Sequence, residues 1–576
     1  MKKNGSQIAT YALEQIGVKY TFGIPGTHTT ELYDAIEKSD KITPILVAHE
    51  GGASFMADAI SRTTDSIGCL TIVPAAGLTH ALSGIGEAYL DGIPMLIISG
   101  GVRRDSGKHY QLHQIDMKPI AQGVTKAQYL IESHETIADT IYEAYQTAIS
   151  GEPGPVFIEF PVEIMMFSKE IKELPSYNLP TLNPTVLEKN IDEAVKILLS
   201  AEYPMMYLGW GARETNEYSI KIAKKLNAPV ALTLQGKSVF PNNHPLYTSC
   251  FIGASGKPSS QYALKKHDAM LAVGVRFSEI STGSYGLDNP KGLIHVDINK
   301  EVFDKNYKSA VNIEGDATVI LKMIWEKIKD LDIKNSNENV ASKIAELNKK
   351  YDEEWLVNKR NDMVSPGWFF DVLNKKLSED TYVVLDDGKH TFLAAELLTT
   401  HKPNHLISPT DFNCMGYCIP AAIATKLAYP DKTVIGIVGD GAAQMTGLEL
   451  ITAKNYEIAP VFFVFNDGEL GQIAQFQKVP LKNKTCSVIG NFNFEGLAIA
   501  TGCEYLLMEN DHMIGETIDK ALQFSKDNKP VLVDVRIDYT KKTMLTKGVI
   551  KINLLRFPLS EKIRFISRMV KRHVLG

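Results

Sequence analysis

The sequence has few cysteines and no apolar run long enough to cross a membrane. Its six cysteines are scattered along 576 residues without paired Cys-x-x-Cys motifs, which argues against a disulfide framework or a zinc site. The N-terminal segment also lacks the apolar stretch that signal peptides contain. We therefore expect a cytoplasmic protein that has no nucleic-acid partner.

The chain is long enough for about three domains, and its apolar pattern divides it in that way. Strand-like apolar runs alternate with helical stretches in three successive blocks, an order typical of parallel sheets covered by helices. The pattern predicts an α/β fold with three doubly wound parallel-sheet domains and a basic C-terminal tail helix. We place these parts at residues 1–170, 185–330, 364–540 and 541–576.

The charge of the tail differs from that of the rest of the chain. Residues 541–576 carry ten Lys and Arg against one Glu, a charge of +9, so the first 540 residues carry −15 (−6 − 9). Apolar residues recur at helical spacing from Leu559: Ile563, Ile566, Val570 and Val574. This pattern predicts a basic amphipathic helix over 559–576, which either contacts an anionic membrane surface or packs on the acidic body.

Two acidic turns follow apolar runs in the third block. Gly-Asp-Gly at 439–441 follows the run 434–438, and Asn-Asp-Gly at 466–468 follows the run 461–465. Residues 448–459 are predicted to form a helix between them. Because parallel strands end at one edge of a sheet, where ligands bind, the two acidic side chains should lie together. Glycines let backbone N–H groups approach a phosphate, and carboxylate oxygens suit Mg²⁺.

Residues 439–472 resemble the diphosphate- and metal-binding motif of thiamine-diphosphate enzymes, and the three-block layout resembles the acetolactate synthase and pyruvate oxidase group. The resemblance implies thiamine diphosphate held together with Mg²⁺. The implied metal ligands are Asp440, Asp467 and the backbone carbonyl of Glu469. Gly439 and Gly441 would border the diphosphate. The family usually carries asparagine where this chain has Asp467, and the added negative charge should favour the cation and oppose the diphosphate.

The resemblance also assigns roles to the three blocks. The first would bind the pyrimidine of the cofactor and the third its diphosphate, with the site between two subunits, so that the protein is at least a homodimer. The middle block holds FAD in some members and is empty or binds another nucleotide in others. Residues 209–212 and 276–279 resemble the flavin loops, but Ile280 stands where a second arginine is usual. FAD is therefore an open alternative.

Thiamine catalysis needs an acid beside N1′ of the aminopyrimidine. The resemblance places Glu50 there, since it follows the apolar run 45–47 and precedes small residues. Met415 matches the apolar side chain that supports the bent cofactor. Gly388 and His390 belong to a turn similar to one that helps to hold the diphosphate.

Two histidines are candidates for contact with the substrate. His28 follows Gly26 in a loop that covers the active site in the family, and its Gly-x-His pattern is similar to that of benzaldehyde lyase, where the histidine acts as acid and base. We expect Gly26 to lie beside the cofactor. His113 stands where acetolactate synthases have a glutamine. Because histidine titrates near neutral pH, either side chain can move a proton at a carbonyl adduct.

Three further positions differ from those that select substrates in acetolactate synthases. Leu112 replaces a phenylalanine, Val162 replaces a lysine, and Phe476 replaces the tryptophan that selects the acceptor. The identities of donor and acceptor therefore stay open.

The function that the resemblance implies is decarboxylation of a 2-oxo acid with carboligation of the resulting enamine to a carbonyl acceptor, dependent on thiamine diphosphate and Mg²⁺. Three alternatives stay open. They are a flavin-linked 2-oxo acid oxidase at the membrane surface, a 2-hydroxyacyl-CoA lyase, and a family member without catalytic activity.

Overall fold

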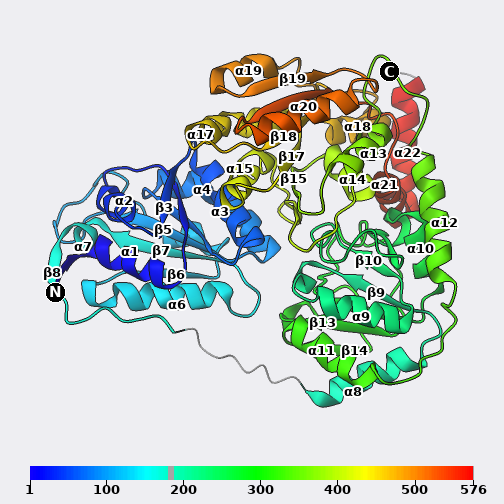
Figure 1. Cartoon of the computed structure of the whole chain (residues 1–576), viewed down its shortest axis with the longest axis horizontal. Coiled ribbons are helices and arrows are strands. Elements are labelled where there is room, and N and C mark those ends of the chain that lie inside the picture. Colours follow the sequence, from blue (N-terminus) through cyan, green and yellow to red (C-terminus); the bar gives the residue numbers. More distant parts are fainter. Residues whose placement is uncertain (179–186, 575–576) are drawn as a thin grey trace.

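The computed structural model describes residues 1–178 and 187–574. The start of the second predicted block (185–186) and the end of the tail (575–576) lie outside the described residues. Figure 1 shows three α/β parts, with the first block at the left, the third across the top and the second at the lower right. Each part holds one six-stranded sheet, and all strand pairs within these sheets are parallel. The predicted fold class is confirmed.

The sheet of the first domain has the strand order β3-β2-β4-β5-β7-β6. Its strands are β2 (Tyr20–Gly23), β3 (Thr43–Leu46), β4 (Gly68–Ile72), β5 (Met95–Gly101), β6 (Ala127–Leu130) and β7 (Pro155–Pro161). Apolar residues of α1 (Gly5–Gln15), α2 (Thr30–Glu37) and α6 (Ile137–Ile149) form one core cluster with it, and those of α3 (Glu50–Thr63) and α4 (Ala76–Asp91) form another. Short helices α5 (Lys118–Gln122) and α7 (Val162–Met166) and an antiparallel pair, β1 (Lys2–Asn4) with β8 (Ser168–Glu170), complete it.

The second sheet has the order β11-β10-β9-β12-β13-β14, which is the arrangement of dinucleotide-binding sheets. Its strands are β9 (Pro204–Leu208), β10 (Val230–Leu232), β11 (Tyr247–Cys250), β12 (Ala269–Val273), β13 (Leu293–Asp297) and β14 (Val311–Glu314). The helices are α8 (Glu188–Ser200), α9 (Asn216–Leu226), α10 (Pro258–Lys266) and α11 (Ala317–Ile328), and α12 (Val340–Glu353) leads to the third domain.

The third sheet, ordered β16-β15-β17-β18-β20-β19, repeats the strand order of the first. Its strands are β15 (Tyr382–Leu385), β16 (Leu406–Ile407), β17 (Val434–Gly439), β18 (Val461–Asn466), β19 (Glu504–Met508) and β20 (Val531–Arg536). Its helices are α13 (Pro366–Lys376), α14 (Lys389–Leu397), α15 (Cys418–Ala428), α16 (Asp440–Thr446), α17 (Leu450–Asn455), α18 (Gly471–Leu481), α19 (Phe494–Thr501) and α20 (Ile514–Lys526).

The first and third domains share one core, in which α3 packs against α15. A buried polar network crosses this junction. Arg62 binds Asp58 at 2.6 Å and Asp91 at 2.9 Å, and the Tyr417 hydroxyl donates to Asp58 at 2.6 Å. Because each buried charge has a partner, the network fixes how the two sheets face one another.

Helical structure in the third domain begins earlier than predicted. In place of one helix over 448–459, α16 begins at Asp440 itself, and α17 follows after a short turn. Gly447, a weak helix former, lies at the break, and Glu457 ends the segment with a φ of 54°. Asp440, the first predicted metal ligand, is therefore the first residue of a helix, α16.

The basic tail forms two helices, α21 (Met544–Arg556) and α22 (Leu559–Val574). They lie along the right edge of the molecule in Figure 1. α21 packs against the second domain near residues 253–255, and α22 contacts α18. None of the helices that the structure describes is long and apolar enough to cross a membrane.

Candidate active site

The first predicted metal ligand lies at the carboxyl edge of the third sheet. Asp440 follows β17 directly, and only 3% of its surface is exposed. One carboxylate oxygen accepts the Gly441 N–H at 2.8 Å, and the other accepts the N–H groups of Asp467 and Gly468 at 3.2 and 2.7 Å. Burial, and next the charge of Asp467, raise the pKa of Asp440 to about 6. A bound cation would offset both effects.

Two polar residues lie at the end of β18, Asn466 and Asp467, and each could offer an oxygen to a metal. Asn466 is buried and its amide donates to Asp534 Oδ1 at 2.9 Å. The Asp467 carboxylate lies 3.4 Å from Lys389 Nζ. Burial raises the pKa of Asp467, and Lys389 opposes that shift. The amide nitrogen of Asn466 is therefore used inside the domain, whereas the Asp467 carboxylate and the buried Asp440 carboxylate lie at the same edge of the sheet, so Asp467 stays the predicted second metal ligand.

The third implied ligand is a backbone oxygen. Glu469 pairs with Val488 in an isolated β-bridge, and its side chain forms an ion pair with Lys484. The carboxylate of Glu469 is thus engaged elsewhere, which leaves its backbone carbonyl as the predicted ligand.

Glycines and one buried histidine form a cradle next to Asp440. A Cβ on Gly439 would lie 3.0 Å from the His390 ring, and one on Gly388 would lie 2.7 Å from it. Gly388 also has a φ of 152°, which favours glycine. Burial lowers the pKa of His390 to about 3, so the ring is neutral at pH 7. Its Nε2 is buried and has no hydrogen-bond partner among the described residues, so this cradle fits a diphosphate oxygen.

A buried carboxyl that the sequence did not single out positions the Met415 loop. Asp386 accepts the N–H groups of Gly416 at 2.9 Å and Cys418 at 2.8 Å, and burial raises its pKa to about 7. The Met415 methyl group would lie 3.5 Å from a Cβ placed on Gly441. Met415 therefore lies next to Gly441, at the start of α16.

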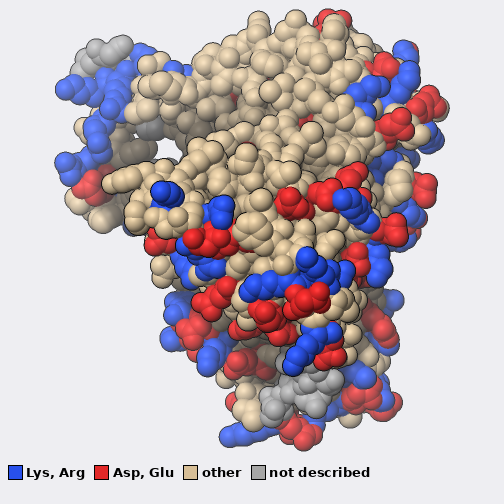
Figure 2. Space-filling view, turned by 90° about the vertical axis from the view of Figure 1, so that its left-hand side faces the viewer, with Lys and Arg blue, Asp and Glu red and all other residues tan. Residues whose placement is uncertain are grey.

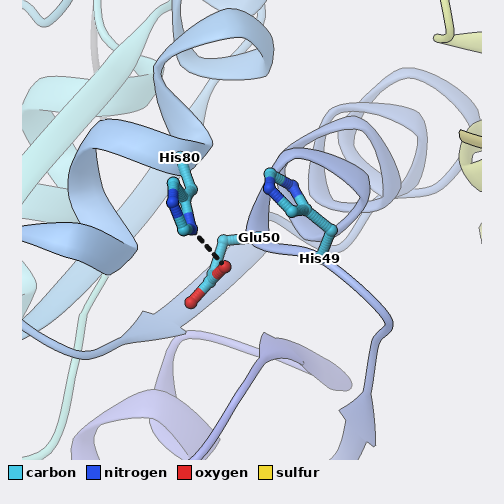
Figure 3. A group of neighbouring side chains, drawn as sticks. All are labelled: His49, Glu50 and His80. Atoms are coloured by element: carbon cyan, nitrogen blue, oxygen red, sulfur yellow. Dashed lines mark hydrogen bonds and ion pairs between the residues drawn. The ribbon is translucent and has the colours of Figure 1, made fainter. Parts of the chain in front are cut away.

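Glu50 begins α3 at the carboxyl edge of the first sheet and is 6% exposed. Its Oε2 lies 3.0 Å from Nδ1 of His80, a residue of α4 (Figure 3). The His80 side chain is 50% exposed and stacks on His49, with ring centroids 4.7 Å apart. His80 therefore connects a buried carboxyl to solvent. The sequence did not reveal this partner, because a histidine within an ordinary helix carries no motif.

The predicted pyrimidine site at Glu50 and the predicted diphosphate site at Asp440 are not joined directly within one chain. Among the described residues, no hydrogen bond or ion pair joins Glu50 to Asp440, Asp467 or His390. Glu449, which lies after α16, connects the two regions instead. It accepts the N–H groups of residues 48 and 49 at 3.1 and 2.9 Å, just before Glu50. The third domain thus supports the turn that presents Glu50.

The structure brings the two candidate substrate histidines together. The rings of His28 and His113 meet edge to face, with centroids 5.3 Å apart. Burial, and next the neighbouring His113, lower the pKa of His28. Gly26 begins the loop and its N–H donates to Thr29 Oγ1 at 3.1 Å. Neither ring hydrogen-bonds Glu50 in the described structure.

The substrate-selecting positions lie in different surroundings. Leu112 is 67% exposed, Val162 is buried, and Phe476 is 38% exposed and lines a cavity beside Lys389.

A second cavity, of about 260 Å³, lies at the carboxyl edge of the middle sheet. Its lining includes Gly211, Arg213, Gly274, Arg276 and Asp297. Arg276 is engaged by ion pairs with two acidic residues, Glu152 and, at 3.5 Å, Asp411. Burial raises the pKa of Asp297 to about 6. Paired glycines at strand ends allow a close approach by a nucleotide, but the guanidinium of Arg276 is already neutralised.

Comparison with known proteins covers most of the chain. Family models match residues 3–120 (thiamine pyrophosphate enzyme, N-terminal TPP binding domain), residues 191–324 (central domain) and residues 386–535 (C-terminal TPP binding domain). The chain is 31% identical to the acetolactate synthase large subunit of Haemophilus influenzae, over 93% of this chain and 95% of that protein. It is 28% identical to the acetolactate synthase isozyme 3 large subunit of Escherichia coli, with the same coverage. It is 30% identical to a probable acetolactate synthase large subunit of Methanocaldococcus jannaschii, over 93% of this chain and 92% of that protein.

Proposed function

The chain belongs to the thiamine pyrophosphate enzyme family, and we propose that it decarboxylates a 2-oxo acid and joins the remaining acyl group to a carbonyl acceptor. The relatives named as acetolactate synthases support this reaction over a flavin-linked oxidase, a 2-hydroxyacyl-CoA lyase or a role without catalysis. The structural observation that carries the proposal is the buried Asp440 carboxylate, which lies beside Asp467 at the end of the sheet.

The proposed cofactor site follows from the cradle around Asp440. The residues that would hold Mg²⁺ are Asp440, Asp467 and the backbone carbonyl of Glu469. The residues that would border the diphosphate are Gly388, His390, Gly439 and Gly441, and Gly26 would lie near the cofactor from the first domain. The orphaned nitrogen of His390 and the raised pKa of Asp440 both support an anion and a cation bound next to each other.

Thiamine diphosphate, when bound, supplies the carbon nucleophile. Glu50 would hold a proton at the pyrimidine N1′ atom, and His80 would pass protons between this buried carboxyl and solvent. Met415 would support the cofactor from one side. His28 and His113 would hold a proton at the substrate oxygen, since their rings, from two different loops, lie 5.3 Å apart.

The function is tested by product analysis. The loaded protein is given pooled 2-oxo acids with and without aldehydes, and products are identified by mass spectrometry. Release of CO₂ with formation of a new carbon–carbon bond is expected. Release of CO₂ without ligation, or no turnover, would contradict the proposal.

A variant tests the role of Glu50. Glu50→Gln keeps the shape but cannot give up a proton, so turnover should fall by about 10²-fold or more, while cofactor binding is largely retained. Glu37→Gln, an exposed glutamate of α2, is the control. Retained activity of Glu50→Gln would remove Glu50 from the mechanism.

We infer that a second copy of this chain completes the site. Figure 2 shows a broad upper face with few charged side chains. Large apolar side chains are exposed where the first domain meets the third, among them Leu46, Met445 and Leu448 at 52%, 61% and 61%. Exposed apolar area of this kind supports a subunit interface. Leu448→Arg should shift the protein toward monomer in sedimentation analysis and reduce activity. An unchanged mass would argue against an interface at this position.

The middle cavity is the candidate FAD site. Its glycine-lined sheet edge supports nucleotide binding. The engaged Arg276 and the apolar Ile280 leave fewer free cations for a diphosphate. Flavin absorbance in the purified protein that substrate bleaches would favour the oxidase alternative, whereas colourless active protein would exclude a flavin role.

The tail helix α22 supports a peripheral membrane contact. Four apolar residues of this helix are exposed by 73%, 59%, 51% and 49%: Leu559, Ile563, Ile566 and Val570. Basic residues surround them, a pattern that suits an anionic lipid surface. Co-sedimentation with anionic vesicles should be lost on truncation before Leu559. Equal binding with and without the tail, or none in either form, would leave α22 as a helix packed on α18.

A further inference from the structure

A cavity of about 270 Å³ lies between the second domain, the third domain and α21. A single water needs roughly 10–15 Å³ on the same measure, so the cavity has room for a small molecule. We call it the C-terminal cavity. Its apolar lining consists of Ile280, Phe392, Phe476, Leu545 and Val549, and its polar lining includes Glu279, Lys389 and Gln472.

The wall formed by α21 is held in place on two sides. The Leu545 N–H donates to Glu396 Oε1 at 3.2 Å, and the Asn553 amide donates to Ser284 Oγ at 3.3 Å. A Cβ on Gly548 would lie 2.7 Å from the backbone of Ala254, so the helix approaches the second domain closely. These contacts make the cavity part of the folded structure.

The C-terminal cavity adjoins the proposed cofactor site. Lys389 lines the cavity, and its ammonium lies 3.4 Å from the Asp467 carboxylate. Lys389 also immediately precedes His390, the buried histidine of the glycine cradle. A molecule in this cavity would therefore lie beside the end of the site where Asp467 would hold the metal.

The charges of the lining disfavour an anionic occupant. Among the described lining residues, Lys389 is the one cationic side chain, and it is already engaged by Asp467 and by the Tyr539 ring at 4.6 Å. Glu279 adds a negative charge to the wall. A carboxylate that entered this cavity would lose its hydration and find no free cationic side chain in return, which is unfavourable.

One polar group in the cavity lacks a partner. The side-chain oxygen of Gln472 is buried and has no hydrogen-bond partner among the described residues. A buried acceptor without a donor is unfavourable, and a ligand hydroxyl would satisfy it. The lining thus combines an apolar wall with one unsatisfied acceptor.

We propose that the C-terminal cavity binds the apolar chain of a neutral acceptor, an aldehyde or ketone with several carbons, rather than an acceptor held by a carboxylate. This assignment of the substrate class rests on the proposed carboligation. The apolar side chains at 280 and 476 then contact the chain. The Gln472 oxygen can accept a hydrogen bond where the acceptor carries a hydroxyl substituent, as the 1-hexanol probe does.

The cavity is tested by calorimetry on the full-length protein loaded with thiamine diphosphate and Mg²⁺. The binding of two probes, 1-hexanol and hexanoate, is measured. Hexanol should bind, and hexanoate should bind about tenfold more weakly or not at all. Val549→Trp fills the cavity and should abolish hexanol binding. Val549→Phe is a milder substitution for use if Val549→Trp folds poorly. Lys547→Trp, on an exposed position of the same helix, is the matched control. Stronger binding of hexanoate, or unchanged hexanol binding by folded cavity-filling variants, would overturn the assignment.

A kinetic series separates this inference from the proposed function. With aldehydes from acetaldehyde to hexanal as acceptors, Val549→Trp or Val549→Phe should raise KM for hexanal about tenfold or more and leave KM for acetaldehyde within about twofold. Ligation that works without any dependence on chain length would contradict the cavity assignment alone. Hexanol binding without ligation of any acceptor would contradict the proposed function alone.

Discussion

The raised pKa of Asp440 predicts that binding of Mg²⁺ depends on pH within an accessible range. The metal needs the ionised carboxylate, and burial and Asp467 raise the pKa of Asp440 to about 6. As pH falls through this value the carboxyl takes up a proton, and affinity for Mg²⁺ is lost. About nine tenths of Asp440 is ionised at pH 7, half at pH 6 and roughly one tenth at pH 5. Apparent affinity should therefore fall about tenfold between pH 7 and pH 5.

The assay is calorimetric titration of Mg²⁺ at several pH values in the presence of thiamine diphosphate. The diphosphate of the cofactor also takes up protons in this pH range, and its contribution is the same in any variant. Asp467→Asn therefore provides the matched comparison. It removes the neighbouring charge that helps to raise the pKa of Asp440, so its midpoint should move to lower pH, while its affinity at pH 8 should be weaker because a charged ligand is lost. Identical pH curves for the two proteins would refute this account of Asp440.

Three further predictions concern residues around the site. His80→Ala removes the imidazole that joins Glu50 to solvent and should lower turnover about tenfold. His49→Ala removes a stacked neighbour and the acceptor of the Gly51 N–H at the start of α3, but no direct partner of Glu50, and should lower turnover less. His28→Ala and His113→Ala should each lower turnover, and the double variant should lose little more if the two rings serve one proton transfer. Asp386→Ala leaves two N–H groups of the Met415 loop without an acceptor and should destabilise the protein by about 1–3 kcal/mol, measured as a lower Tm, with weaker cofactor binding.

The fold class and the main candidate residues could be predicted from the sequence because their signals are local. Apolar runs alternating with helical stretches determine parallel sheets, and a carboxylate just after a strand must lie at the carboxyl edge. Glu50, Asp440 and Asp467 all have this position, and the structure places each of them at a sheet edge. The helix expected over 448–459 is present only as the shorter α17 (Leu450–Asn455), because Glu457 adopts a left-handed conformation, and the separate helix α16 before Gly447 was not predicted.

The remaining features depend on contacts between distant parts of the chain. His80 reaches Glu50 across 30 residues, and Lys389 reaches Asp467 across 78. The C-terminal cavity needs three separate segments and a helix from the tail. No periodicity or spacing records such contacts, since they arise only when separate elements pack together. The sequence by itself determined the fold class and pointed to the candidate residues for the cofactor. The tertiary structure decided which side chains pair with these candidate residues, which position them and which enclose them. Burial and charge pairing are properties of the packed molecule.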